Sequence, residues 1–137
     1  FIPKQVIELV INDFKSKKCD VITVSGEINS EDEISNPNCV LVETDLNDYA
    51  TNFSRTQKLD NPRRHVGIYG YRLKTLRELV SLEPTANELN LKLEQMRFLD
   101  NKYSIFVSKS DLVIPNGIDT SDDVVAAENY LKEYEDN

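Results

Sequence analysis

The chain has 137 residues, of which 39% are hydrophobic and 29% charged, and this composition suits one ordinary globular domain with a single core. Its formal net charge of −8 disfavours nonspecific binding to nucleic acid or to an anionic membrane, because it leaves no surplus of Lys and Arg to neutralise phosphates. No apolar run approaches the roughly 20 residues that span a bilayer. We therefore expect neither a nucleic-acid nor a membrane partner, whereas a small anionic substrate remains compatible with a few local cations.

The first part of the chain predicts one helix followed by three strands. Val6, Leu9, Val10 and Phe14 recur at helical spacing in the opening segment. In chain order we expect a helix over residues 3–18, a strand over 19–26, a polar loop with one helical turn over 27–38, and a hairpin of strands over 39–45 and 49–54.

The rest of the chain alternates between helical and strand patterns. We expect a basic loop over 55–64, a strand over 65–72, helices over 73–82 and 86–100, a strand over 103–108, and a last helix over 122–135 capped by Thr120 or Ser121. In the helix over 73–82, Leu73, Leu76, Leu79 and Val80 are predicted to share one face.

This mixed order favours a layered α/β fold with an antiparallel β insertion. The strands are few for a complete doubly wound domain, and the chain opens on Phe rather than Met. We therefore expect residues 1–137 to be a single domain that lacks an N-terminal part. Cys19 and Cys39 have no metal-ligand spacing and lie beside strand-like runs, which predicts buried free thiols and a reducing, cytoplasmic location.

The segment "HVGIYGY" contains the only histidine of the chain. On a strand, His65, Gly67, Tyr69 and Tyr71 share one face, and glycine in a strand often marks the close approach of a ligand or of another backbone. This face can be the floor of a polar pocket. It can equally be an exposed sheet face with aromatic cross-strand pairs, and the residues alone leave both open.

Two further segments carry candidate binding groups. In "LEQMR", Leu93 and Met96 are spaced to face a core, while the polar residues between and after them fit a solvated helix face or a set of hydrogen bonds to sugar hydroxyls. In "FSR", Arg55 follows a strand end and can bind a carboxylate or phosphate, although a surface arginine fits as well.

Asp119 lies in the glycine-containing loop "PNGIDT", just before the last predicted helix. Its carboxylate can ligate Mg²⁺, an ion that prefers oxygen ligands. A helix cap formed by Asp119 or Thr120 explains the same pattern. The sequence shows no nucleophile–base pair and no glycine loop that cradles phosphates.

Five segments in order resemble one family. They are "NPN" at 36–38, "FSR" at 53–55, "RHVGIYGYR" at 64–72, "LEQMR" at 93–97 and "GIDTSDD" at 117–123. Each is weak alone, but together they are similar to the C-terminal portion of the 3-deoxy-manno-octulosonate cytidylyltransferases, or CMP-Kdo synthetases. The resemblance runs from about Pro3 to the last helix.

The resemblance implies a partial nucleotide-diphospho-sugar-transferase fold, which is Rossmann-like, in a homodimeric, Mg²⁺-dependent enzyme of lipopolysaccharide or capsule biosynthesis. Such enzymes transfer CMP from CTP to the sugar acid Kdo and release pyrophosphate. Two sets of site residues follow from the match: a sugar-acid pocket of Arg55, His65, Tyr69, Glu94 and Gln95, and Asp119 as the Mg²⁺-binding, catalytic aspartate.

The chain also departs from the family. The N-terminal half, with its CTP-binding loop and first metal-binding aspartate, is expected to be absent, so we expect this chain alone to be inactive. The loop between Arg55 and His65 is short, and Leu91 replaces a common Glu, which leaves open which 2-keto-3-deoxy sugar acid is bound. Two alternatives remain: a noncatalytic dimerisation or sugar-binding module, and an unrelated α/β domain with chance matches.

Overall fold

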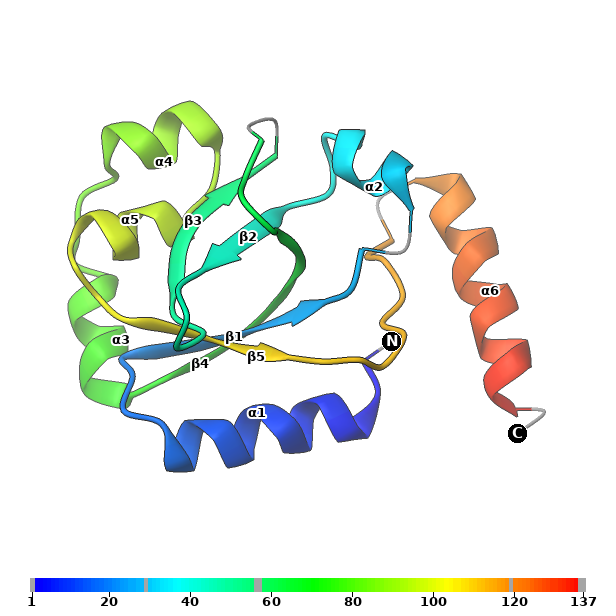
Figure 1. Ribbon diagram of the computed structural model, residues 1–137, viewed down its shortest axis with the longest axis horizontal. Helices are drawn as coiled ribbons and strands as arrows, with labels where there is room; N and C mark the ends of the chain where they lie inside the picture. The colour runs from blue at the N-terminus through cyan, green and yellow to red at the C-terminus, as the bar shows by residue number, and fades with distance from the viewer. Residues whose placement is uncertain (1, 29, 56–57, 119, 136–137) are drawn as a thin grey trace.

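The fold contains both helices and strands in a computed structural model that describes residues 2–28, 30–55, 58–118 and 120–135 (Figure 1). Within these residues the elements are α1 (Lys4–Ser16), β1 (Val21–Gly26), α2 (Glu31–Ser35), β2 (Leu41–Thr44), β3 (Ala50–Ser54), β4 (Arg63–Tyr71), α3 (Leu73–Leu79), α4 (Ala86–Leu91), α5 (Gln95–Asp100), β5 (Ile105–Lys109) and α6 (Ser121–Glu135).

The strands form one five-stranded sheet in the order β3-β2-β4-β1-β5. Strands β1 and β5 run parallel, whereas the β2–β3 hairpin and its neighbour β4 pair antiparallel. The hairpin tip reaches the opposite edge, where Tyr49 bridges Phe106 and the Val107 N–H donates to the Asp48 carbonyl over 2.9 Å. The predicted α/β fold with an antiparallel insertion is confirmed, and the sheet is strongly curved.

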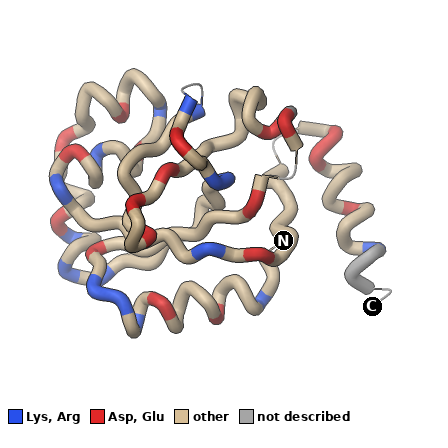
Figure 2. Tube along the Cα trace, viewed as in Figure 1, with Lys and Arg blue, Asp and Glu red and all other residues tan. Residues whose placement is uncertain are grey.

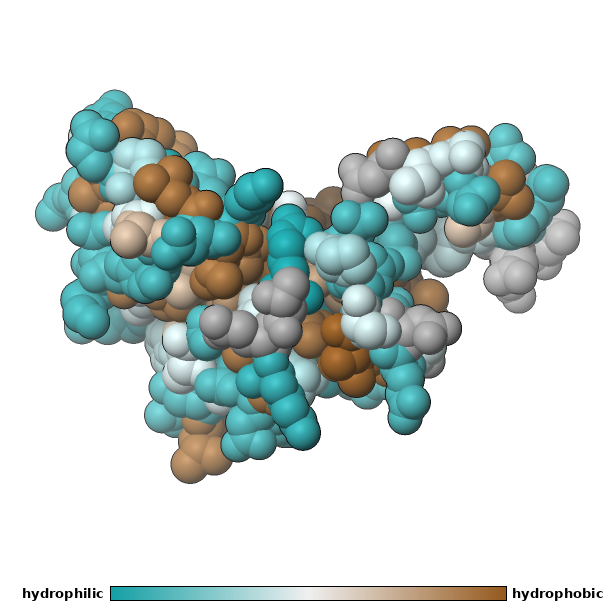
Figure 3. Space-filling model, turned by 90° about the horizontal axis from the view of Figure 1, so that it is seen from above, coloured by the Kyte–Doolittle hydropathy of each residue, from teal (hydrophilic) through white to brown (hydrophobic). Residues whose placement is uncertain are grey.

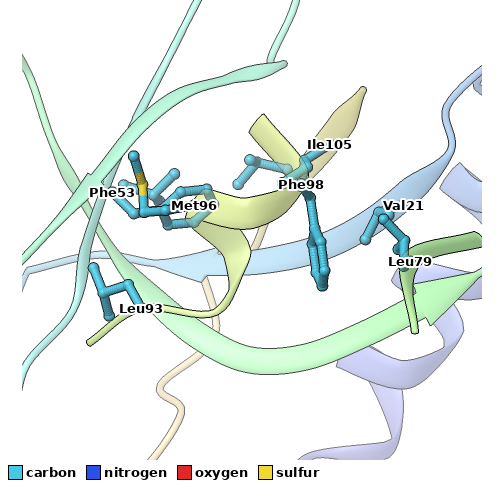
Figure 4. Close-up of a cluster of buried hydrophobic side chains, with 9 residues drawn as sticks. Val21, Phe53, Leu79, Leu93, Met96, Phe98 and Ile105 are labelled. Atoms are coloured by element: carbon cyan, nitrogen blue, oxygen red, sulfur yellow. The ribbon is translucent and has the colours of Figure 1, made fainter. Parts of the chain in front are cut away.

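Two apolar clusters form the core. One lies between α1 and the sheet and joins Val6 and Val10 to Ile22 and Val24 of β1. The other lies where α3 and α5 pack on the sheet (Figure 4), and it contains Val21, Val42, Phe53, Leu79, Leu93, Met96, Phe98, Ile105 and Val107. The predicted inward orientation of Leu93 and Met96 is confirmed.

The predicted helix over residues 86–100 is wrong, because it is two helices. Helix α4 begins with a capping box between Thr85 and Glu88 and ends at Lys92, whose backbone is left-handed with φ 54°. Helix α5 starts after Glu94. The break lets Leu93 enter the core and changes the direction of the residues that follow it.

Helix α3 also differs from its prediction. Of the four apolar residues expected on one face, Leu79 is buried, at 2% exposure, and the other three are exposed. Leu73 and Val80 are 64% and 74% exposed, and Leu76 is 38% exposed. The helix ends at Leu79 after barely two turns, so it covers the core with one residue and leaves an apolar surface uncovered.

Strand β4 is longer than predicted and carries a bulge. It begins at Arg63 rather than His65, because Arg63 and Arg64 pair with Val42 and Leu41 of β2. Consecutive residues Thr23 and Val24 of β1 pair with Tyr69 and Val66, which are three residues apart. Two residues of β4, Gly67 and Ile68, are therefore extra at this point, and an even number of extra residues keeps the alternation of faces.

The remaining sequence predictions concern the two thiols and the surface. Both cysteines are free; Cys19 is buried as expected, whereas Cys39 is only half-buried. Every helix carries acidic residues, with Lys and Arg interspersed along the chain (Figure 2). Among the described residues, none of the helices has the length and apolarity that a membrane crossing requires.

Candidate functional site

A cleft of about 480 Å³ lies beside β4 and is lined mainly by polar residues. Besides β4, its walls come from α2 with the loop 36–40, the residue after β3, residues 92–95 between α4 and α5, and the start of α6 with the loop that enters it. From above, hydrophilic side chains occupy the middle of the molecule between the α4–α5 body and the arm formed by α6 (Figure 3).

The structure brings the predicted pocket residues together at this cleft. Arg55, His65, Tyr69, Glu94 and Gln95 all line it. Asp119 lies outside the described residues, but Gly117 and Thr120 on either side of it also line the cleft. Thr120 caps α6: its hydroxyl accepts from the Asp123 N–H, and its own N–H donates to the Asp123 carboxylate over 2.8 Å.

Arg55 is held at the mouth of the cleft by the loop that contains "NPN". Its Nη1 donates to the carbonyls of Pro37 and Asn38 over 3.2 and 3.3 Å. Both bonds use the same nitrogen, and Arg55 has no ion pair among the residues that the structure describes. The guanidinium therefore keeps donors and its charge for an anionic ligand.

His65 is a neutral group inside the cleft. Its ring lies edge-on to Phe53, with centroids 5.1 Å apart, and 5.5 Å from the ring of Tyr69. Burial, with a smaller contribution from the charge of Arg55, lowers the pKa of His65 to about 4. The Nε2 atom lies 2.9 Å from the Thr23 hydroxyl, so only Nδ1 remains for a ligand.

Two polar groups in the cleft lack internal partners. Gln95 is only 6% exposed, yet its side-chain amide makes no hydrogen bond within the described part of the chain. The same holds for the Tyr69 hydroxyl, whose pKa is raised by burial and further by Tyr71 and Glu94. Among the described residues, the fully buried side-chain nitrogen or oxygen that lacks a partner is Nε of Arg64, which also lines the cleft. The Gln95 amide and the Tyr69 hydroxyl keep some exposed surface, so they open to the cleft, where a hydrogen-bonding ligand can reach them.

An ion pair positions the segment that carries Glu94 and Gln95. Arg97 donates from Nε and Nη2 to both carboxylate oxygens of Glu88, over 2.7 and 2.6 Å, which ties α5 to α4. This contact lowers the pKa of Glu88. The expected solvated face over residues 94, 95 and 97 is therefore wrong for Gln95 and Arg97, and only Glu94 is exposed.

Residues 1–105 match the sequence profile of a family described as cytidylyltransferase, which covers well over half of the chain. The chain belongs to the cytidylyltransferase family. It is 34% identical to a 3-deoxy-manno-octulosonate cytidylyltransferase of Thermodesulfovibrio yellowstonii and 36% identical to one of Flavobacterium johnsoniae, over 97% and 95% of its own length. These matches cover 57% and 56% of the two relatives, so the chain spans little more than half of their length.

A solved cytidylyltransferase structure has the same fold. It is that of CMP:2-keto-3-deoxy-manno-octonic acid synthetase complexed with CTP, and it superimposes with a TM-score of 0.84 at 23% identity. The match covers 95% of this chain and 56% of that one, so the fold is confirmed as a partial version of this architecture.

The structure adds to the cleft a residue that the sequence analysis missed. Arg64 is 6% exposed, lines the cleft, and donates to the Asn116 amide oxygen over 2.7 Å and to the Ile114 carbonyl. It thereby anchors the loop that leads to Asp119. Arg64 and His65 are consecutive residues of β4, so their side chains leave opposite faces of the strand, and both line the cleft. The sequence offered no signal for Arg64, because it is one of several arginines in a basic segment.

The described residues are compatible with a magnesium ion but do not form a site by themselves. Among them, no group of three His, Cys, Asp or Glu side chains could hold a metal. Magnesium usually takes only one or two carboxylates, with water and substrate phosphates as its other ligands. Asp119 lies outside the described residues; a single carboxylate in its sequence segment, of which Gly117 and Thr120 line the cleft, fits that pattern chemically.

Proposed function

We propose that this chain is the sugar-acid-binding part of a cytidylyltransferase that joins the CMP of CTP to a 2-keto-3-deoxy sugar acid such as Kdo. The observation that carries the proposal is the gathering of a free cation and unpartnered neutral groups in one cleft. Arg55 offers charge to a carboxylate, while Tyr69 and Gln95 offer hydrogen bonds to hydroxyls. A polyhydroxylated acid matches both kinds of group.

The reaction needs orientation more than covalent participation by the protein. The anomeric oxygen of the sugar forms a bond to the α-phosphorus of CTP, the bond from that phosphorus to the bridging oxygen of the β-phosphate breaks, and the hydroxyl proton is lost. Pyrophosphate leaves. Arg55 holds the carboxylate, and His65, Tyr69, Glu94 and Gln95 fix the sugar so that its oxygen is aimed at the nucleotide.

Magnesium, when bound by Asp119 and substrate phosphates, would neutralise charge between the two anionic substrates. We propose the same cofactor for the complete protein, and a place in lipopolysaccharide or capsule biosynthesis in the bacterial cytoplasm. The chain alone is proposed to bind the sugar acid without transferring CMP to it, because the curated relatives are almost twice as long.

Calorimetric titration of the chain with Kdo tests the binding part of this proposal. We expect saturable binding that Arg55→Ala weakens by about tenfold, the loss expected for one charge-assisted contact. Arg77→Ala is the matched control, because Arg77 lies on α3 and does not line the cleft. Equal affinities for both variants would overturn the assignment of Arg55.

Pyrophosphate release tests the catalytic part. The full gene product, with whatever sequence its gene encodes upstream, is expected to release pyrophosphate from CTP only when Kdo and Mg²⁺ are present. Asp119→Ala is expected to lower this rate by at least about a hundredfold, since positioned charge in the transition state is worth several kcal/mol. An unchanged rate would remove Asp119 from the mechanism.

A homodimer is also proposed, supported by the exposed apolar surface of α3. Leu73, Leu76 and Val80 leave water-exposed apolar area on a single short helix. Sedimentation of the full gene product is expected to show a dimer that Leu73→Glu/Val80→Glu dissociates. A dimer unaffected by both charges would place the interface elsewhere.

A further inference from the structure

Thr23 lies directly beneath the imidazole of His65. It is fully buried on β1, and its hydroxyl oxygen is 2.9 Å from Nε2 of His65. The sequence gives no reason to select this residue, since threonine is common in strands and Thr23 sits in the apolar run "VITVSG". The structure singles out Thr23 because its hydroxyl lies within hydrogen-bond distance of the His65 ring and of two backbone carbonyls.

The bulge of β4 presents carbonyl groups to the same hydroxyl. Gly67 and Ile68 are the extra residues opposite Thr23 and Val24. The Thr23 hydroxyl lies 2.8 Å from the Ile68 carbonyl oxygen and 3.3 Å from that of Val66. A bulge disrupts the local ladder, and here it places two backbone carbonyl groups within hydrogen-bond distance of one buried hydroxyl.

The available protons decide which group donates. A threonine hydroxyl has a single proton, and a carbonyl can only accept. Two oxygens 2.8 Å apart repel unless a proton lies between them, so Thr23 donates to Ile68. Its oxygen is then an acceptor toward His65, and Nε2 of the neutral ring must carry the proton. Nδ1 is left as an unprotonated acceptor.

We propose that Thr23 is a positioning residue that fixes His65 as its Nε2–H tautomer, so that Nδ1 accepts a hydrogen bond from a hydroxyl of the ligand. The ligand part rests on the proposed function. An acceptor at this position excludes a carboxylate oxygen, which has no proton to offer, and leaves the carboxylate of the sugar acid to Arg55. His65 would thus bind a hydroxyl group of the ligand, and Arg55 would bind its carboxylate.

Nitrogen NMR of the chain labelled with ¹⁵N-histidine tests the tautomer directly, because His65 is the only histidine and needs no assignment. At neutral pH we expect one pyrrole-type signal from Nε2 and one pyridine-type signal from Nδ1. Two averaged signals, or a protonated Nδ1, would overturn the proposal.

Three substitutions separate the role of Thr23 from general stability. Thr23→Val removes the hydroxyl at constant shape and is expected to give a mixture of tautomers, with Kdo affinity reduced roughly tenfold. Thr23→Ser keeps the hydroxyl and is expected to restore a single tautomer and an affinity within about twofold of the parent.

Thr75→Val, at a buried threonine of α3 that does not line the cleft, is the control for a lost buried hydroxyl. An unchanged tautomer in Thr23→Val would contradict the proposal, and if that variant does not fold, a mixture of tautomers in the parent or in Thr23→Ser would still contradict it.

Titration of the labelled chain with Kdo tests the ligand part. We expect the Nδ1 signal to move as it accepts a hydrogen bond, while Nε2 keeps its proton. Saturable binding with an unmoved Nδ1 would overturn the hydroxyl assignment. Absence of binding, together with the expected tautomer, would instead count against the proposed function and leave the action of Thr23 on His65 standing.

Discussion

The two faces of β1 are equally buried but are stabilised in different ways. Ile22 and Val24 are 0% exposed and pack with α1, in a cluster that contains only apolar side chains and a thiol. Thr23 and Ser25, also 0% exposed, point to the opposite face, where they hydrogen-bond to His65 and Arg63. The first face is complete without a ligand, whereas the second continues into a cleft with unpartnered groups.

This difference separates structural from binding residues on two strands that pair with each other. Substitutions of the apolar residues on the α1 side should change the free energy of unfolding and leave ligand affinity alone, whereas Arg64, which reaches the cleft from that face of β4, is an exception. Substitutions on the cleft side should lower ligand affinity, because the polar groups there contribute to binding. Removing an unpaired polar group there should not lower the free energy of unfolding, because such a group costs stability in the absence of a ligand. Four experiments test the separation.

The largest effect is expected on the apolar face. Ile22→Ala should lower the free energy of unfolding by about 2–5 kcal/mol, because it removes three buried carbons and leaves a cavity beneath α1. Urea denaturation measures the loss. Calorimetry on the folded variant should give an unchanged Kdo affinity; a tenfold weaker affinity would show that the two faces are coupled.

The cleft face should instead respond to pH through His65. Its folded pKa of about 4 lies below the ordinary value of 6.5, so the unfolded chain takes up the proton first as the pH falls. Stability from this group is complete above about pH 6.5 and is lost progressively toward pH 4, by roughly 3 kcal/mol in total.

Denaturation of the parent and of His65→Gln at about pH 7 and pH 4 isolates this contribution, since other titrating groups act on both proteins. The parent should lose roughly 3 kcal/mol more than the variant. Equal losses would mean that the imidazole is solvated and charged in the folded state.

Two glycines of β4 allow the same substitution to be made on each face. A Cβ at Gly70 would lie 2.7 Å from Cγ2 of the buried Ile22, whereas one at Gly67 would meet nothing within 4 Å. Gly70→Ala should therefore cost about 1–3 kcal/mol, and Gly67→Ala less than about 0.5 kcal/mol.

Thermal or urea denaturation compares the two glycine variants. As a check on the cause, Gly70→Ala should cost less in the Ile22→Ala background, where the clashing methyl is absent. Similar losses at the two glycines would refute the asymmetry between the faces.

The smallest change in stability, with the opposite sign, is expected at Gln95. Gln95→Met keeps the volume but removes an amide without an internal hydrogen bond from a side chain that is only 6% exposed, and should raise the free energy of unfolding by about 1 kcal/mol. Kdo affinity should fall by at least about tenfold. Gln5→Met, on the exposed surface of α1, should change neither quantity. A destabilised Gln95→Met would indicate that the amide has a structural partner.

Local pattern was sufficient for most elements, because strand alternation and helical spacing depend on near neighbours. Prediction from local pattern failed where contacts between residues distant in sequence override the local helix propensity. Lys92 is an ordinary helix former, yet the helix breaks there as Leu93 enters the core and Arg97 pairs with Glu88. Leu73 and Val80 fit a helical face, but α3 ends at Leu79 and both side chains stay more than 60% exposed.

For the site, the sequence by itself determined which chemical groups are present and which family they resemble: an arginine after a strand, a lone histidine, two tyrosines and a Glu-Gln pair. Only the tertiary structure decided that five of these side chains meet at one cleft, that Gln95 and Tyr69 lack internal partners there, and that Thr23 sets the proton on His65. The reason is physical. Residue type follows from one position, whereas a hydrogen bond between β1 and β4 depends on the register of strands that lie about forty residues apart, and a bulge of two residues sets that register.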